Sequence, residues 1–107
     1  MQPQATFAIS IVLKYEEYGW AAQCLEYDIA AQGRTIGEAK TAFEKAFIGQ
    51  IIVDISHGIA PLSQILAAPQ HYWQMFDKSE KLMGRKSYYI PPPYMVRATA
   101  EDVRICA

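Results

Sequence analysis

A change of hydrophobic period in the first half of the chain constrains the fold more than any other feature. Apolar residues alternate over residues 7–13, which is the period of a strand with one buried face. From Ile36 onward the apolar residues recur at helical spacing. Thr35 and Glu38 have the spacing of a capping box, in which the hydroxyl accepts from the Glu38 N–H and the carboxylate reaches back to the Thr35 N–H. The sequence therefore predicts strands that lead into a capped helix.

The remaining elements follow from the same periods and from turn residues. The segments expected to be extended are 7–14, 20–25, 29–32, 87–90 and 94–98. The segments expected to be helical are 36–56, which His57 and Gly58 end, and 70–83, which follows Pro69. A turn is expected over 15–19, and the first two strands are antiparallel if this connection is a hairpin. Residues 101–107 are expected to fray.

The composition is that of one folded domain. The 107 residues are 51% hydrophobic and 20% charged, which is enough apolar surface for a core. We therefore expect a single α+β domain over residues 1–107. It has a small antiparallel sheet of three to four strands packed by the main helix, a second helix and a Pro-rich C-terminal strand segment.

The charge and the segment pattern narrow the partners. A formal net charge of −1 disfavours direct DNA binding, because phosphate contacts normally need a basic excess. The one basic cluster, Lys81, Arg85 and Lys86, is interpreted as a solvated helix end. The N-terminal residues lack a signal-peptide pattern, and the apolar stretch 46–55 is interrupted by two polar residues. We expect no membrane span and a cytoplasmic location.

No catalytic constellation stands out, so the chain is not expected to be an enzyme. His57 is interpreted as a helix cap and His71 as an exposed residue of the second helix. Cys24 is expected to be a small buried hydrophobe, and a disulfide with Cys106 stays open. Four carboxylates could crowd one edge of the sheet and hold a metal ion, although solvated loops are favoured: Glu16, Glu17, Glu26 and Asp28. A metal-dependent nuclease is thus the third hypothesis; neither a metal nor a cofactor is expected.

The stretch over residues 6–57 resembles the N-terminal domain of the HicB-type antitoxins. The family pattern has an aromatic-rich strand after a glycine, a Gln-Gly before a threonine, and Glu-Ala at the start of a helix. Here these features are Gly19-Trp20, Gln32-Gly33, Thr35 and Glu38-Ala39. The resemblance implies a βββα fold related to a degraded RNase H architecture, without its metal site. It also implies inhibition of a small RNA-cleaving toxin by covering its active site.

Two parts of the chain depart from the family pattern. The loop over residues 25–29 is one residue shorter than usual and lacks a proline, and Gly37 stands where an acidic residue is common. Residues 58–107 show no basic DNA-recognition helix, and Pro61, Pro69 and the run 91–93 would interrupt one. The chain therefore resembles a solitary HicB-like core with a helical and Pro-rich extension.

The leading hypothesis is a HicB-like antitoxin or a protein-binding module derived from one. Trp20, Glu26, Tyr27 and Asp28 are the expected partner contacts, whereas the capping pair at the helix start is structural. Acidic contacts suit a small basic HicA-like toxin, because opposite charge speeds association. The alternative is a solitary, self-associating domain without a toxin partner. Binding of a small ligand is part of this alternative. A homo-oligomer is expected in either case.

Overall fold

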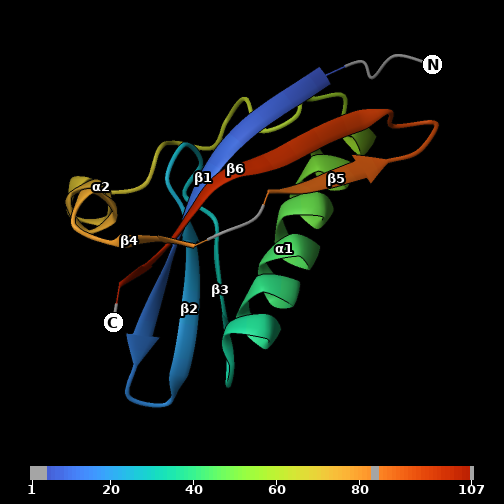
Figure 1. The fold of residues 1–107 in the computed structure, drawn as a ribbon. Coiled ribbons are helices and arrows are strands. Elements are labelled where there is room, and N and C mark those ends of the chain that lie inside the picture. Colours follow the sequence, from blue (N-terminus) through green and yellow to red (C-terminus); the bar gives the residue numbers. More distant parts are fainter. Residues whose placement is uncertain (1–4, 83–84, 107) are drawn as a thin grey trace.

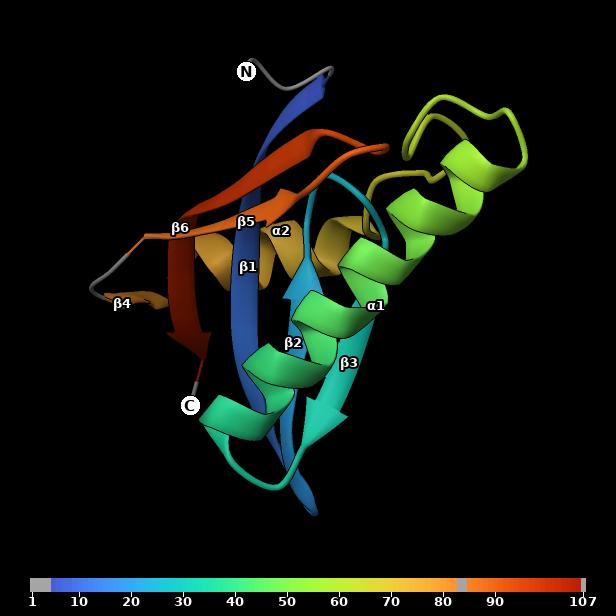
Figure 2. The same cartoon turned by 90° about the vertical axis from the view of Figure 1, so that its right-hand side faces the viewer.

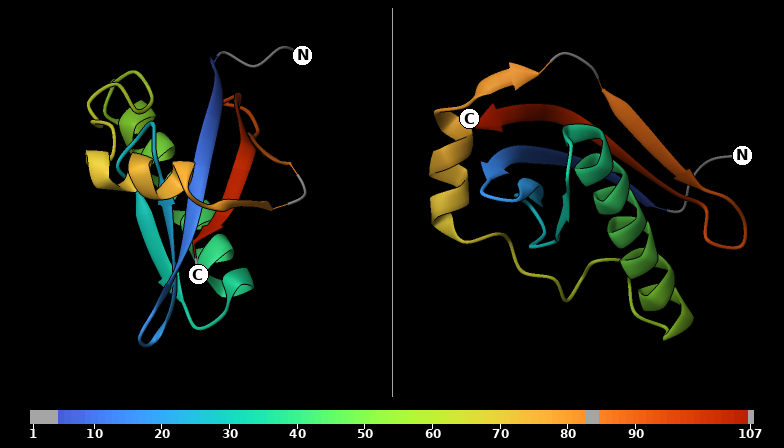
Figure 3. Two further views of the ribbon diagram at one scale, coloured as in Figure 1. Left: turned by 60° about the vertical axis from the view of Figure 1, so that its left-hand side comes forward. Right: turned by 90° about the horizontal axis from the view of Figure 1, so that it is seen from below.

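The computed structural model describes residues 5–82 and 85–106, which form one sheet with a helix on each face (Figure 1). The elements in chain order are β1 (Ala5–Glu16), β2 (Gly19–Cys24), β3 (Ala30–Gly33), α1 (Ile36–Ser56), α2 (Gln70–Asp77), β4 (Glu80–Leu82), β5 (Lys86–Ile90) and β6 (Val96–Cys106). Figures 2 and 3 show α1 and α2 on opposite sides of the strands. The α+β class expected from the sequence is confirmed. None of the helices within the described ranges is long and apolar enough to span a membrane.

The sheet is larger than predicted and is not purely antiparallel. Its strand order is β3-β2-β1-β6-β4, and β5 also pairs with β6. The strands β1, β2 and β3 are antiparallel neighbours, whereas β6 runs parallel to β1 from the Ala5–Val96 pair to the Lys14–Cys106 pair. The expectation of three or four antiparallel strands was therefore wrong. Residues 6–57 and 58–107 contribute to the same sheet and to the same hydrophobic core.

The expected fraying was also wrong for residues 101–106, because these residues belong to β6; residue 107 lies outside the described residues. A bulge explains why the alternation was missed. Ile9 pairs with Ala100 but Ser10 pairs with Asp102, so Glu101 is an extra residue in β6. Such an insertion changes which residues face the core. With the extra residue in place, Val103 belongs to the core cluster beneath α1.

The helix α1 begins and ends where the sequence predicts. The Glu38 N–H donates to the Thr35 hydroxyl at 3.1 Å, so the N-cap is confirmed. The returning carboxylate bond differs from the prediction: Glu38 accepts at 2.8 Å from the N–H of Arg34, not from that of Thr35. Inside the helix, Phe43, Phe47 and Ile51 are fully buried and pack against the sheet.

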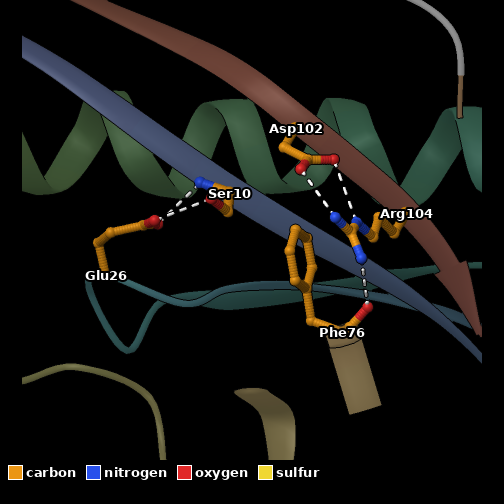
Figure 4. A network of polar contacts seen from close by, with 5 residues as sticks. All are labelled: Ser10, Glu26, Phe76, Asp102 and Arg104. Carbon is orange, nitrogen blue, oxygen red and sulfur yellow. Dashed lines mark hydrogen bonds and ion pairs between the residues drawn. The ribbon is translucent and has the colours of Figure 1, made fainter. Parts of the chain in front are cut away.

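The helix α2 is shorter than predicted and ends at Asp77; the predicted end at Met83 lies outside the described residues. The Ser79 hydroxyl donates to the Met75 carbonyl at 2.6 Å. Arg104 on β6 donates to the Phe76 carbonyl at 3.2 Å, and its guanidinium stands 4.2 Å from the centre of that phenyl ring (Figure 4). A cation at the C-terminal carbonyls of a helix is favourable. These contacts stabilise the end of α2 against the sheet.

Candidate protein-binding surface

The structure separates the expected partner contacts into two groups. Trp20 is the second residue of β2, beside the β1–β2 turn, whereas Glu26, Tyr27 and Asp28 follow the opposite end of β2. The four residues therefore do not form one surface. The turn itself comprises only Glu17 and Tyr18, because the preceding two residues still pair with β2.

Glu26 makes internal hydrogen bonds with β1. One carboxylate oxygen accepts from the Ser10 N–H at 2.7 Å, and the other accepts from the Ser10 hydroxyl at 2.8 Å (Figure 4). Ser10 stands at the register shift between β1 and β6. The carboxylate is thus an acceptor for a backbone N–H at a place where the regular ladder is interrupted.

Tyr27 and Asp28 also have internal partners. The Tyr27 ring makes edge contacts with Phe7 and Phe47, with ring centres 5.8 and 6.5 Å apart. The Asp28 carboxylate accepts from Gln23 at 2.9 Å, and the Asp28 N–H donates to the Leu66 carbonyl at 2.7 Å. These contacts hold the β2–β3 connection to the core and to the loop after α1.

The candidate metal and catalytic residues are dispersed. Glu16 and Glu17 lie at the β1–β2 turn, far along β2 from Glu26 and Asp28. Among the residues that the structure describes, no group of three or more His, Cys, Asp or Glu side chains could hold a metal ion. The two histidines lie where the sequence places them, His57 as the C-cap of α1 and His71 exposed in the first turn of α2.

The two cysteines are free and differ in accessibility. Burial raises the pKa of the Cys24 thiol to about 12. Because the thiolate is the reactive form, we expect iodoacetamide at neutral pH to modify Cys106, which is half-buried, while Cys24 stays unmodified in the folded protein. Mass spectrometry of the intact protein and its peptides measures this. Equal modification of both thiols in the native state would contradict the placement of Cys24 in the core.

A shallow groove beside the β1–β2 turn is the best candidate for a binding surface. It has a volume of about 460 Å³, and we call it the hairpin groove; its lining residues are Glu16, Glu17, Tyr18, Gly19, Trp20, Gln32, Gly33 and Arg34. Tyr18 is 89% exposed. The half-buried Trp20 ring packs edge-on against the exposed Tyr15 ring, with the two ring centres 5.3 Å apart. Exposed aromatic rings next to charged side chains are typical of protein-binding sites.

The open edge of β3 adjoins this groove. Among the strands of the described ranges, β3 is the last in the sheet and pairs only with β2. The Cys24 N–H donates to the Ile29 carbonyl at 3.0 Å, which continues the β2–β3 register. Bonded and non-bonded pairs alternate in an antiparallel ladder. The N–H and C=O groups of Ala30 and Gln32 therefore point away from β2 toward the open edge.

No family model, no curated protein and no solved structure matches this chain. The candidate surface therefore rests on its geometry alone. Of the four contacts expected from the sequence, Trp20 lines the hairpin groove and the other three do not. The groove's exposed ring, Tyr18, carries a weak sequence signal, since it is an aromatic residue inside a polar, glycine-bounded turn.

Proposed function

We propose that the chain is a protein-binding module of the HicB-like antitoxin type, which binds a small basic RNA-cleaving toxin and covers its active site. The observation that carries this proposal is the meeting of an open strand edge with an exposed aromatic and acidic turn. The Trp20–Gly33 pair places the end of β3 directly beside the start of β2 (Figure 1). One partner element can therefore contact both features at once.

The strand edge supplies affinity without demanding a particular sequence. An extended segment of a partner adds to such an edge through main-chain hydrogen bonds. In β3 these groups belong to Ala30 and Gln32, and both residues have exposed side chains. A partner strand placed there would extend the sheet and bring its neighbouring residues over the hairpin groove.

The groove supplies selectivity for a basic partner. Its lining includes two carboxylates, on Glu16 and Glu17, and one guanidinium, on Arg34, so the net charge of the lining is negative. A ribonuclease that binds RNA phosphates carries a basic surface, and complementary charge raises the association rate. Tyr18 is the anchor in this arrangement, because its ring is almost wholly exposed in the unbound chain.

Two substitutions test this assignment without disturbing the core. Tyr18→Ser removes the exposed ring and is expected to weaken toxin binding about 30-fold, the effect of a ~2 kcal/mol hot spot. Gln32→Pro removes an outward N–H that β2 does not use and is expected to weaken binding to a similar degree. The toxin is first isolated by copurification with the chain from its native cells. Affinity is then measured by titration calorimetry and inhibition by an RNA-cleavage assay.

Leu66→Ser is the matched control, because Leu66 is 82% exposed and lies outside the groove. This variant should bind and inhibit as the unmodified chain does. Recovery of only the chain itself, as a defined oligomer, would contradict the antitoxin proposal and favour a self-associating domain. Equal losses for Tyr18→Ser and Leu66→Ser would contradict the placement of the site at the hairpin groove.

A further inference from the structure

A second hollow is lined by residues of α1 and of the sheet strands β1, β2, β5 and β6, together with Arg85. Its volume is about 220 Å³, and we call it the basic pocket. Apolar side chains line its interior, among them Ile11 from β1, Phe43 from α1 and Val103 from β6. Three cationic side chains, those of Lys40, Arg85 and Lys86, complete its wall. The pocket is thus apolar inside and basic at its rim.

The ion pairs around the rim leave one positive charge in excess. Lys86 donates to the Glu44 carboxylate at 2.9 Å, and Arg85 lies 3.5 Å from the Glu101 carboxylate. No ion pair involves Lys40 within residues 5–82 and 85–106. Three cations and two carboxylates therefore give a net charge of +1, which one monovalent anion would neutralise.

Tyr88 adds a neutral hydrogen-bonding group to the wall. The residue is 5% exposed and lines the pocket, and the Lys86 amine lies 5.6 Å from the centre of its ring. Burial, helped by the Glu44 carboxylate, raises the pKa of Tyr88 to about 12. Its phenol therefore stays protonated at neutral pH and adds no negative charge that would repel an anion.

We propose that the basic pocket binds a small monocarboxylate with a compact apolar body. The apolar side chains of the interior pack against the body of the ligand, and the Lys40 ammonium, which carries the excess charge, pairs with its carboxylate. The volume is below the ~300–1,000 Å³ of pockets that hold drug-sized ligands, so the ligand is small. A polyphosphate does not fit this arrangement, because it would bring several charges to a rim with an excess of one.

Three probes of graded chemistry test the proposal on the full chain alone. They are 3-phenylpropionate, its uncharged analogue 3-phenylpropanamide, and acetate, which has the charge without the apolar body. In an NMR titration, 3-phenylpropionate is expected to shift the aromatic resonances of Phe43 and Tyr88. The affinities of the amide and of acetate are each expected to be lower by at least about tenfold, because each compound lacks one of the two complementary parts.

Variants of α1 separate a specific site from general attraction. Lys40→Gln is expected to weaken 3-phenylpropionate binding about tenfold. Lys45→Gln removes the same charge from an exposed position of α1 outside the pocket and should change nothing. Glu44→Gln is expected to strengthen binding severalfold, because it frees the Lys86 amine and removes a negative charge from the rim.

Equal binding of the acid and its amide would overturn the proposal, as would shifts confined to residues outside the pocket. Equal effects of Lys40→Gln and Lys45→Gln would also overturn it. The experiment requires no toxin, and the pocket and the hairpin groove share no lining residue. The outcome is therefore independent of whether the chain is an antitoxin.

Discussion

Replacing Gly33 with alanine is expected to lower the free energy of unfolding by about 3 kcal/mol. A Cβ atom at Gly33 would meet the backbone nitrogen of Ala39 and lie 2.6 Å from the carbonyl carbon of Glu38. Both atoms belong to the first turn of α1, and a backbone contact cannot be relieved by a change of rotamer. The turn would have to move away from β3 and disturb the N-cap. Urea denaturation followed by circular dichroism measures the loss.

Gly49→Ala is the matched control, because among the described residues no atom other than the adjacent backbone of α1 lies within 4 Å of the Cβ that it adds. A helical glycine is less stable than alanine by ~0.5–1 kcal/mol, so this variant should be more stable than the unmodified chain. The opposite signs distinguish a steric effect from a general intolerance of alanine. A Gly33→Ala variant as stable as the unmodified chain would contradict the close packing of β3 on α1.

The first half of the fold could be predicted because its signals are local. The capping pair is three residues apart, and the apolar period of α1 is visible within its own segment. The predicted helix is also confirmed over residues 51–55, although most of these are β-branched and therefore weak helix formers. It could be predicted there because no turn residue separates them from the preceding turns of α1. At the N-cap of α1, the Glu38 carboxylate accepts from the N–H of Arg34, one residue before the predicted Thr35.

The strand β6 could not be predicted from its own residues. Its parallel partner β1 is some ninety residues earlier in the chain, as the Ala5–Val96 pair shows. Its apolar alternation is broken at Glu101, where the bulge adds a residue. Such pairing depends on distant parts of the chain. The local sequence from residue 101 onward is polar and irregular, and therefore predicts a frayed end.

The binding surfaces show the same limit. The acidic side chains of Glu26 and Asp28 predict contacts with a basic partner. In the structure, however, both residues form internal hydrogen bonds, Glu26 with β1 and Asp28 with the loop after α1. The basic cluster was interpreted as a helix end because α2 was expected to extend to 83. The actual end at Asp77 leaves residues 80–82 to form β4, and Lys86 at the start of β5 reaches Glu44 on α1. The chemistry of these residues was visible, whereas their neighbours were not.

Replacing Glu26 with alanine is expected to lower the free energy of unfolding by about 2–3 kcal/mol. The change removes both acceptors of Ser10, and its backbone N–H stands at the β1–β6 register shift. The loss is larger than that of an ordinary hydrogen bond, because the acceptor is charged and a partly buried donor is left without its partner. Glu26→Gln keeps one carbonyl acceptor and should recover part of the loss. Chemical denaturation of the three proteins measures the order.

Asp28→Ala is the control for this interpretation, since Asp28 is exposed and its carboxylate accepts one hydrogen bond, from Gln23, within the described part of the chain. Its expected cost is about 1 kcal/mol or less. Binding of the proposed toxin, measured under conditions in which each variant is folded, then distinguishes a structural role of Glu26 from a direct contact with the partner. Unchanged affinity for Glu26→Ala would place the residue among those that hold β1 in register. A large loss of affinity with little loss of stability would instead place the partner at the β2–β3 connection, and the hairpin groove would no longer be the binding site.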